Sequence, residues 1–298
     1  MASTESIFVL SQDDGILSVI DTRADEIAAK ITIGGKPAAF AIDRTSGKAF
    51  ATLPDKGEIV VIDLAQRSAV STLKVGGQPF GIASDGAGRL FVGDWSANRI
   101  SVVDENSGGV EKTLSVGRSP AHLVAARDGS RVYVADRESN TVAVIDGRSL
   151  KILSEVPVGR APFALALTPD QTQLVVANVQ AATLSIIDTA TMKVVASPAT
   201  GPMPYGVAVT QDNSEILVSN QHGGTVSILD AQTRLPRAEI KVGRYPEGVA
   251  VLRDGRKAYV ANWFSGSVSV IDLKADAEIK KIKCPEGPRM VLVGAAQR

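Results

Sequence analysis

Side chains that can move protons or bind an anion stand just after a proline that recurs about every 42 residues. The first position after this proline carries Tyr205, Glu247 and Arg289. The second position, which is small in five of the seven copies, carries His122. Carboxyl and imidazole groups act as general acids or bases, and arginine binds anionic groups. His122, Glu247 and Tyr205 are therefore the candidate catalytic residues, and all four are candidate ligand contacts.

A second group of candidates combines aromatic rings, arginines and one further histidine. Binding sites favour these residue types because they join a large apolar area to charge or hydrogen bonding. The additional candidate ligand-binding residues are Phe80, Phe163, Trp95, Trp263, Arg118, Arg160, Arg244, Arg137 and His222. Alternatively, these residues have a structural role. The aromatic rings would then cover the open ends of the core between blades, and His122 would form a hydrogen bond with neighbouring backbone. The arginines would then pair with Asp13, Asp55, Glu138, Glu247 and Glu286.

The sequence contains none of the common motifs for metal, haem or nucleotide binding. HExxH, CxxCH, the GxxxxGK[ST] loop and Gly-x-Ser-x-Gly do not occur. Two histidines cannot form a three-histidine metal site, and a site of His122, Glu247 and a loop carboxylate has no supporting spacing. The single cysteine, Cys284, excludes an internal disulfide framework. We therefore expect no metal and no cofactor.

An internal repeat must position these candidates. A Val-Ile-Asp type of phrase recurs seven times, and its aspartates are 42, 41, 42, 42, 42 and 42 residues apart. Each unit holds four short runs rich in Val and Ile, bounded by Gly, Asp, Asn or Pro, which is the pattern of strands. The units occupy the whole chain, which predicts one domain over residues 1–298. Four strands in each unit of about 42 residues predict an all-β, seven-bladed β-propeller.

The two ends of the sequence predict how the ring closes. Residues 7–10 have the pattern of the second strand of a unit, and residues 290–293 have that of a first strand. We therefore expect the C-terminal strand to complete the N-terminal blade as an antiparallel neighbour. Such closure removes a sheet edge that would otherwise be open to aggregation.

The direction of the strands sorts the loops into two faces. In a four-stranded meander, the loops between blades and the loops joining the second and third strands emerge on one face, here named the upper face. All the candidates lie on it or at strand ends beside it. Tyr205, Glu247 and Arg289 come from consecutive blades, so we expect them to converge at the upper mouth of the central channel, with His122 opposite. The aspartates that end the third strands, and the Asp or Asn residues that end the second, are expected to stabilise the following turns.

The phrases Tyr133-Val134-Ala135-Asp136 and Tyr259-Val260-Ala261-Asn262 are each followed by a turn and then by VAVID or VSVID. With the Val-Gly-x-x-Pro segments, they make the chain resemble the YVTN-type β-propeller repeat family over all seven units. The resemblance implies the fold. It leaves the function open, because related propellers include lactonases, lyases, quinone- or haem-associated dehydrogenase subunits and non-catalytic binding proteins.

Composition narrows the class of function. The 32 Lys and Arg residues balance the 32 Asp and Glu residues, which disfavours duplex nucleic acid as a partner. No apolar run reaches the ~20 residues that span a bilayer, and no signal peptide is visible. We therefore expect a cytoplasmic monomer without membrane contact, or a periplasmic one if a signal was removed. The preferred function is binding of a small molecule, peptide or protein by the upper face. The alternatives are a lactonase-like hydrolase or a lyase and, third, single-stranded nucleic acid binding.

Overall fold

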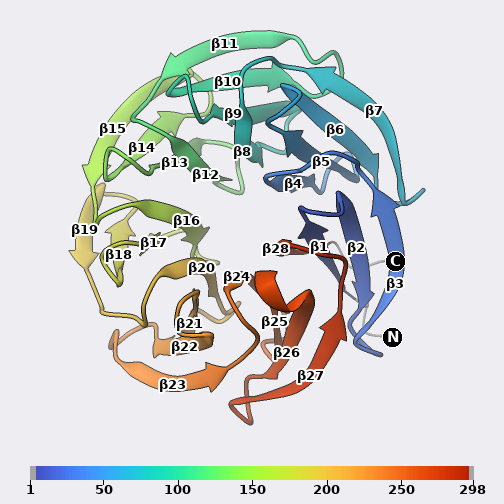
Figure 1. Ribbon diagram of the computed structural model, residues 1–298. Coiled ribbons are helices and arrows are strands. Elements are labelled where there is room, and N and C mark those ends of the chain that lie inside the picture. Colours follow the sequence, from blue (N-terminus) through green and yellow to red (C-terminus); the bar gives the residue numbers. More distant parts are fainter. Residues whose placement is uncertain (1–4, 295–298) are drawn as a thin grey trace.

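The computed structural model describes residues 5–294, which form a closed ring of seven four-stranded antiparallel sheets (Figure 1). Each sheet is one blade, and its first strand lies nearest the central axis while its fourth lies at the rim. The all-β seven-bladed propeller predicted from the repeat is confirmed. The described residues contain one helical turn, η1 (Trp263–Ser265), and no helix long and apolar enough to cross a membrane.

The blades follow the repeat of the sequence. Blades 1 to 3 are β28 (Pro288–Val293), β1 (Ser6–Ser11), β2 (Ile16–Asp21), β3 (Glu26–Thr32); β4 (Phe40–Asp43), β5 (Lys48–Leu53), β6 (Glu58–Asp63), β7 (Ser68–Lys74); and β8 (Pro79–Ser84), β9 (Arg89–Asp94), β10 (Arg99–Asp104), β11 (Val110–Ser115). Blades 4 and 5 are β12 (Pro120–Ala125), β13 (Arg131–Asp136), β14 (Thr141–Asp146), β15 (Lys151–Pro157); and β16 (Pro162–Leu167), β17 (Gln173–Asn178), β18 (Thr183–Asp188), β19 (Lys193–Ala196). Blades 6 and 7 are β20 (Pro204–Val209), β21 (Glu215–Asn220), β22 (Thr225–Asp230), β23 (Pro236–Lys241); and β24 (Pro246–Val251), β25 (Lys257–Asn262), β26 (Ser267–Asp272), β27 (Ala277–Lys283).

The ring closes through blade 1, where the two ends of the chain meet. Strand β28 pairs antiparallel with β1, with Val291 opposite Val9 and Val293 opposite Ile7. In Figure 1 the red β28 lies beside the dark blue β1. The closure expected from the incomplete first and last units is therefore confirmed.

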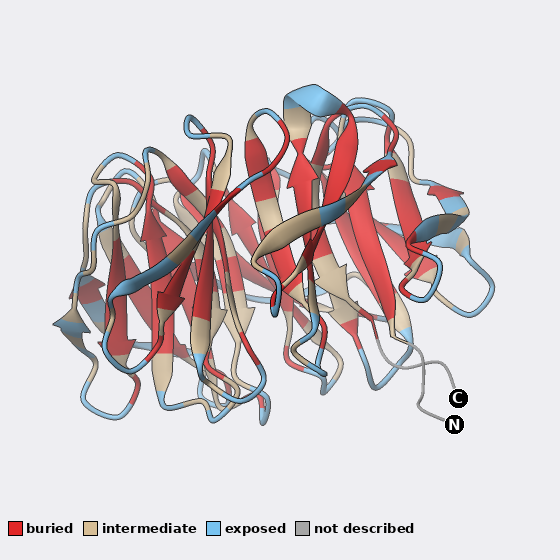
Figure 2. Cartoon of the chain, turned by 90° about the horizontal axis from the view of Figure 1, so that it is seen from below, coloured by how far each residue is buried: buried red, intermediate tan, exposed pale blue. Residues whose placement is uncertain are grey.

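The core lies between neighbouring blades, where the Val- and Ile-rich strand interiors face one another. The third residue after each repeated proline is buried in every blade, from Phe40 in blade 2 to Val291 in blade 1. Figure 2 shows the buried strand interiors and the exposed loops at the two faces. Each layer of the core is packed between two neighbouring blades. The closed ring therefore fixes the position of every first strand around the central axis.

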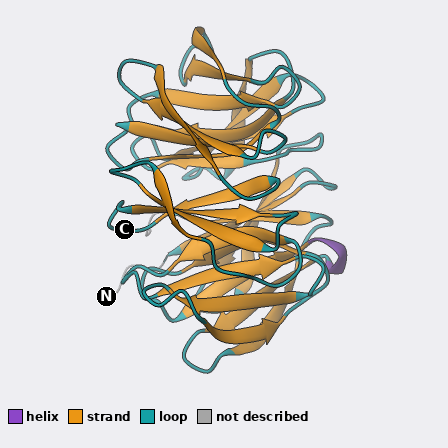
Figure 3. Cartoon of the chain, turned by 90° about the vertical axis from the view of Figure 1, so that its left-hand side faces the viewer, coloured by secondary structure: helices purple, strands orange, loops and turns teal. Residues whose placement is uncertain are grey.

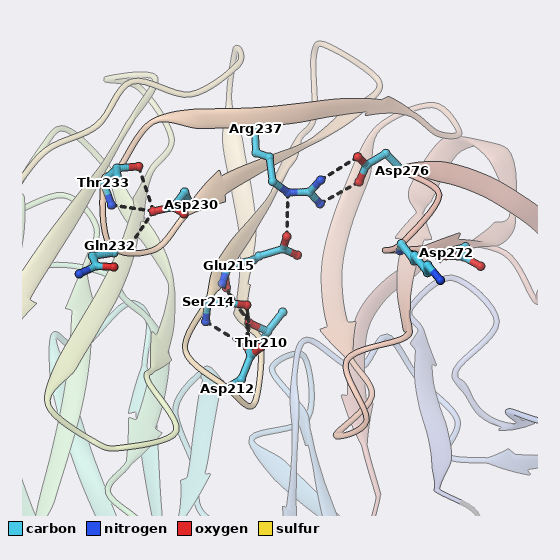
Figure 4. Close-up of polar contacts among 11 residues, drawn as sticks. Thr210, Asp212, Ser214, Glu215, Asp230, Gln232, Thr233, Arg237, Asp272 and Asp276 are labelled. Carbon is cyan, nitrogen blue, oxygen red and sulfur yellow. Dashed lines mark hydrogen bonds and ion pairs between the residues drawn. The ribbon is translucent and has the colours of Figure 1, made fainter.

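The two faces differ in their loops. In Figure 3 the helical turn η1, in purple, lies on one side of the ring. On the face opposite η1, the aspartate that ends each third strand accepts hydrogen bonds from amides two or three residues later. Figure 4 shows this for Asp230, which binds the amides of Gln232 and Thr233 at 3.0 and 2.6 Å. These turn-stabilising aspartates have the structural role that was predicted for them.

The polar residues that end the second strands have a different role from the one predicted. Asn262 is fully buried, accepts the Gly243 amide at 3.1 Å and donates to the Ser269 hydroxyl at 2.9 Å. Asn178 and Asn220 likewise donate to serines of their third strands. Because the position is buried, the side chain needs partners inside the blade rather than in the turn. Asp94 combines both roles, since it also accepts the amide of Ala97 in the following turn.

Candidate functional site

Side chains from four blades meet across the axis at the upper end of the channel. Phe80, Phe163, Tyr205 and Arg289, each directly after its repeated proline, form the group named here the axial cluster. The Phe80 and Phe163 rings lie 6.3 Å apart and the Phe163 and Tyr205 rings 4.2 Å apart. Tyr205 accepts a hydrogen bond from Arg289 at 3.1 Å, and the Arg289 guanidinium lies 5.6 Å from the Phe80 ring. The contacts close a circuit, so the axial cluster covers the upper end of the channel.

Arg289 is the central charge of this cluster. Its side chain is only 10% exposed, and its guanidinium lies between the rings of Phe80 and Trp263, 5.4 Å from the latter. Its Nε is 3.8 Å from Oε2 of Glu247. Burial opposes the charge, but the neighbouring Tyr205 and Glu247 raise the pKa of Arg289 overall. The structure thus brings together Tyr205, Glu247 and Arg289, as their places in the repeat suggested.

Glu247 lies beneath the surface, with 4% of the residue exposed. Its Oε1 accepts a hydrogen bond from Gln221 at 2.8 Å, whereas its Oε2 has no hydrogen-bond partner. Burial raises the pKa of Glu247 to about 7, although Arg289 and Gln221 act in the opposite direction. A carboxyl group in this state is partly protonated near neutral pH and can donate or accept a proton.

His122 lies apart from this charge pair. It stands one residue further along its first strand than the positions of the axial cluster, and it lines the channel. Its Nδ1 accepts the backbone amide of Leu165 at 3.2 Å, and burial lowers the pKa of His122 to about 4. The imidazole is therefore neutral at pH 7 and bound to backbone, as the structural alternative anticipated.

Both tryptophans of the chain contribute to the upper surface around the axis. Trp95 follows β9, and its ring lies 4.7 Å from that of Phe80 at 46°. Trp263 begins η1 and covers Arg289. Both are partly exposed, and together they form an aromatic surface with a cation at its centre.

A separate groove lies on the upper face between blades 6 and 7. Its volume is about 530 Å³, and its lining includes His222, Arg244, Tyr245 and Phe264. Tyr245 lies 5.9 Å from the His222 ring and 4.8 Å from the Phe264 ring. His222 is therefore brought to an aromatic groove near the rim rather than to the channel mouth.

The predicted arginine rim holds loops together. Arg118, Arg160 and Arg244 each donate to a backbone carbonyl twenty residues later, at 2.9, 3.1 and 2.9 Å. None of the three forms an ion pair within residues 5–294, so the carboxylate partners of the structural alternative were wrong for them. The loop carbonyl lies closer than any acid side chain in each repeat. Arg137 differs, since it pairs with Glu138.

The central channel beneath the axial cluster is a cavity of about 730 Å³. Its wall is formed by the first strands, and its lower end is lined by Arg44, Arg127 and Gln171. The sequence reasoning missed this lower end, because it weighed arginines only on the upper face. The available signal was the arginine just after the first strand of blades 2, 4 and 7: Arg44, Arg127 and Arg253.

The described part of the chain also places the cysteine and the residue types that could bind a metal. Residues 5–294 contain no group of three or more His, Cys, Asp or Glu residues that could hold a metal ion. Cys284 follows β27, is buried, and has a pKa that burial raises to about 12. The thiol is therefore not poised to act as a nucleophile at neutral pH.

Comparisons with solved structures show the same fold in proteins of low sequence identity. A functionally unknown protein from Desulfotomaculum acetoxidans DSM 771 is 14% identical, with a TM-score of 0.84 and 98% of this chain and 99% of that one covered. Hydrazine synthase of Kuenenia stuttgartiensis is 20% identical, with a TM-score of 0.77 and coverages of 89% and 91%. Dihydro-heme d1 dehydrogenase NirN in complex with DHE is 15% identical, with a TM-score of 0.72 and coverages of 93% and 63%.

Sequence comparison gives the family. No curated protein matches the chain in sequence. The YNCE-like beta-propeller family matches over residues 16–214, about two thirds of the chain. This match agrees with the resemblance to YVTN-type repeats and with the seven-bladed fold. The chain therefore belongs to the YNCE-like beta-propeller family.

Proposed function

We propose that the protein is a non-catalytic binding propeller whose site is the aromatic surface around Arg289 on the upper face. The observation that carries this proposal is the position of the Arg289 guanidinium between the rings of Phe80 and Trp263. A cation held among partly exposed rings offers stacking and charge to one ligand group. The expected ligand group is planar, aromatic and anionic, carried by a small molecule or by a side chain or terminus of a protein partner.

Rigidity supports this assignment. Phe80 and Arg289 lie near the start of first strands in a closed ring of blades. Arg289 is held further by its hydrogen bond to the Tyr205 hydroxyl at 3.1 Å. A guanidinium that is already oriented loses little conformational freedom on binding. Glu247 neutralises the charge of Arg289 only in part. Burial raises the pKa of Glu247 to about 7, so part of the Glu247 population is protonated and uncharged near neutral pH.

Intrinsic fluorescence tests the proposal, because both tryptophans of the chain lie on this surface. The probe is 4-nitrobenzoate, a planar anion that quenches stacked indole rings, and its uncharged control is 4-nitrobenzamide. We expect saturable quenching by the anion, at least tenfold weaker binding of the amide, and the same loss in Arg289→Met. The matched control, Arg244→Met, lies in the rim groove and should bind as the wild type does. Equal binding of acid and amide, or no effect of Arg289→Met, would contradict the proposal.

The enzyme alternative rests on Glu247, a buried carboxyl group whose pKa of about 7 suits general acid–base chemistry. Hydrolysis of a panel of lactones that is lost in Glu247→Gln, with an unchanged melting temperature, would favour a lactonase-like hydrolase. For the nucleic-acid alternative, quenching of Trp95 and Trp263 by a single-stranded oligothymidylate would be the supporting result.

A further inference from the structure

The central channel opens toward the lower face, at the end of the axis opposite the axial cluster. Its upper end is covered by the axial cluster, whose members also line the top of the cavity. A first strand of six residues gives a wall about 20 Å long at about 3.3 Å per residue. The cavity of about 730 Å³ lies within the usual range of small-molecule sites, roughly 300–1,000 Å³.

The wall of the channel is apolar. Side chains along it include Val124, Ala166, Ala208, Met290 and Leu292. The histidine in the wall is neutral at pH 7, because its pKa is lowered to about 4. Such a wall favours an apolar ligand body over a polar one.

Two of the arginines at the lower mouth have no ion-pair partner. Arg44 and Arg127 line it, and neither forms an ion pair within the described residues. Their side-chain contacts are with the backbone carbonyls of Val293 and Pro169, at 3.5 and 3.4 Å. Partial burial lowers the pKa of Arg44, as do the charges of Arg253 and Arg127, while Glu5 raises it. Both guanidinium groups therefore contribute positive potential to the same mouth of the channel.

The carboxylates at this end already have partners. Asp43 accepts hydrogen bonds from the amides of Thr45 and Ser46 and from the Ser84 hydroxyl, at 2.6, 3.2 and 3.1 Å. Asp85 forms an ion pair with Arg89 at 2.8 Å. In the same way, Arg253 is paired with Glu5 at 3.2 Å. The cations left without an acid partner are thus the two that line the cavity.

We propose that the channel binds an unbranched aliphatic carboxylate, with its alkyl chain inside the channel and its carboxylate between Arg44 and Arg127 at the lower mouth. The apolar wall selects the chain, and the two guanidinium groups select the charge. The axial cluster closes the upper end of the channel, so the ligand can enter only through the lower mouth. This fixes the orientation of the ligand, with its alkyl chain inside. This site is independent of the proposed upper-face function and lies at the opposite end of the axis.

The test measures binding of sodium dodecanoate by isothermal titration calorimetry, below its micelle concentration. Dodecanol is the uncharged control, and dodecyltrimethylammonium is the control of opposite charge. We expect one dodecanoate per chain, at least tenfold weaker binding of both controls, and at least tenfold weaker binding to Arg44→Ala/Arg127→Ala. The matched control Arg148→Ala/Arg256→Ala removes the same charge from exposed arginines that do not line the cavity, and should bind normally.

A second variant tests the channel itself. Ala166→Leu places bulk in the wall and should weaken dodecanoate binding; its melting temperature checks that the fold is kept. Dodecanoate should leave the fluorescence of Trp95 and Trp263 unchanged, which separates this site from the upper face. Binding that survives Arg44→Ala/Arg127→Ala, equals that of dodecanol, or quenches the tryptophans would overturn the lower-mouth site. Loss of dodecanoate binding in Arg44→Ala/Arg127→Ala would leave 4-nitrobenzoate binding at the upper face unaffected, so the two proposals can fail separately.

Discussion

Asp136 is a buried acid in a position where the next three blades have asparagine, and Asp136→Asn should stabilise the protein as the pH rises. Asp136 is 0% exposed, and neither carboxylate oxygen forms a well-aligned hydrogen bond, although the Gly117 amide and the Thr141 hydroxyl lie nearby. Asn178, Asn220 and Asn262 instead bind serine hydroxyls, whereas the equivalent residue in blade 4 is Ala143. Blade 4 therefore carries an acid without the hydroxyl that its neighbours use.

The size of the effect follows from the pKa. Burial raises the pKa of Asp136 from 3.8 to about 7, with the Gly117 amide and the Thr141 hydroxyl lowering it and Glu155 raising it. Between these two values the folded state holds a proton that the unfolded state has lost, so stability falls as the pH rises from about 4 to about 7. The full difference corresponds to about 4 kcal/mol at 1.36 kcal/mol for each tenfold change in acidity.

The measurement is thermal unfolding of wild type and Asp136→Asn at pH 5 and pH 8. The advantage of Asn should grow by about 2–3 kcal/mol between these pH values, because much of the wild-type loss occurs in this interval. For a chain of this size that difference is about 5 °C in melting temperature. Asp136→Asn/Ala143→Ser, which restores the hydroxyl partner, should add about 1 kcal/mol at both pH values.

The control is Asp94→Asn, at the same position in blade 3. Asp94 binds Arg99 at 3.1 Å and accepts the amides of Gln78 and Ala97, so its charge has partners. Its replacement should bring no gain at pH 8. If the advantage of Asp136→Asn were the same at pH 5 and pH 8, or if the variant were less stable at pH 8, the reasoning from an unpartnered buried acid would be refuted.

Two further predictions concern the rim and the ring closure. The triple variant Arg118→Ala/Arg160→Ala/Arg244→Ala removes three exposed hydrogen bonds to loop carbonyls, which should contribute about 1 kcal/mol each. Differential scanning fluorimetry should therefore show a melting temperature lower by several degrees. An unchanged melting temperature would show that these hydrogen bonds do not stabilise the fold. Deletion of residues 288–298 removes β28, the inner strand of blade 1. The edge of β1 is then unpaired and β24 loses a strand that it packs against, so we expect insoluble protein or the loss of cooperative unfolding by circular dichroism. A truncated protein that melts within a few degrees of the full chain would disprove closure by β28.

The fold could be predicted from the sequence because seven copies of one pattern remove the ambiguity of any single short strand. The same repeat predicted where Tyr205, Glu247 and Arg289 meet, since a position within the repeat corresponds to one height along the axis. The order of the blades then placed the three residues on the first strands of three consecutive blades. Convergence was thus a property of backbone geometry, which the repeat specifies well.

Side-chain partners could not be predicted in the same way. The repeat does not predict which ring of another blade covers Arg289. That ring is Trp263, which lies in a loop whose sequence differs from blade to blade. The bond from Leu165 to His122 also joins two blades. Arg118 donates to the backbone carbonyl of Glu138, whereas the Glu138 carboxylate pairs with Arg137. Contacts between blades depend on rotamers and on unique loops, which the repeat leaves free.

The axial cluster separates the two proposed sites. Its outer side, with Trp263 over Arg289, faces the upper surface and offers charge among aromatic rings. Its inner side forms the roof of an apolar channel whose charges lie at the far mouth, at Arg44 and Arg127. Because Arg289 is held by Tyr205 and Glu247 within the roof, its charge is largely satisfied on the channel side. In the two proposals, an anion from below is attracted at the lower mouth and its apolar end meets rings, whereas a ligand above meets the Trp263 ring and the charge of Arg289 next to it.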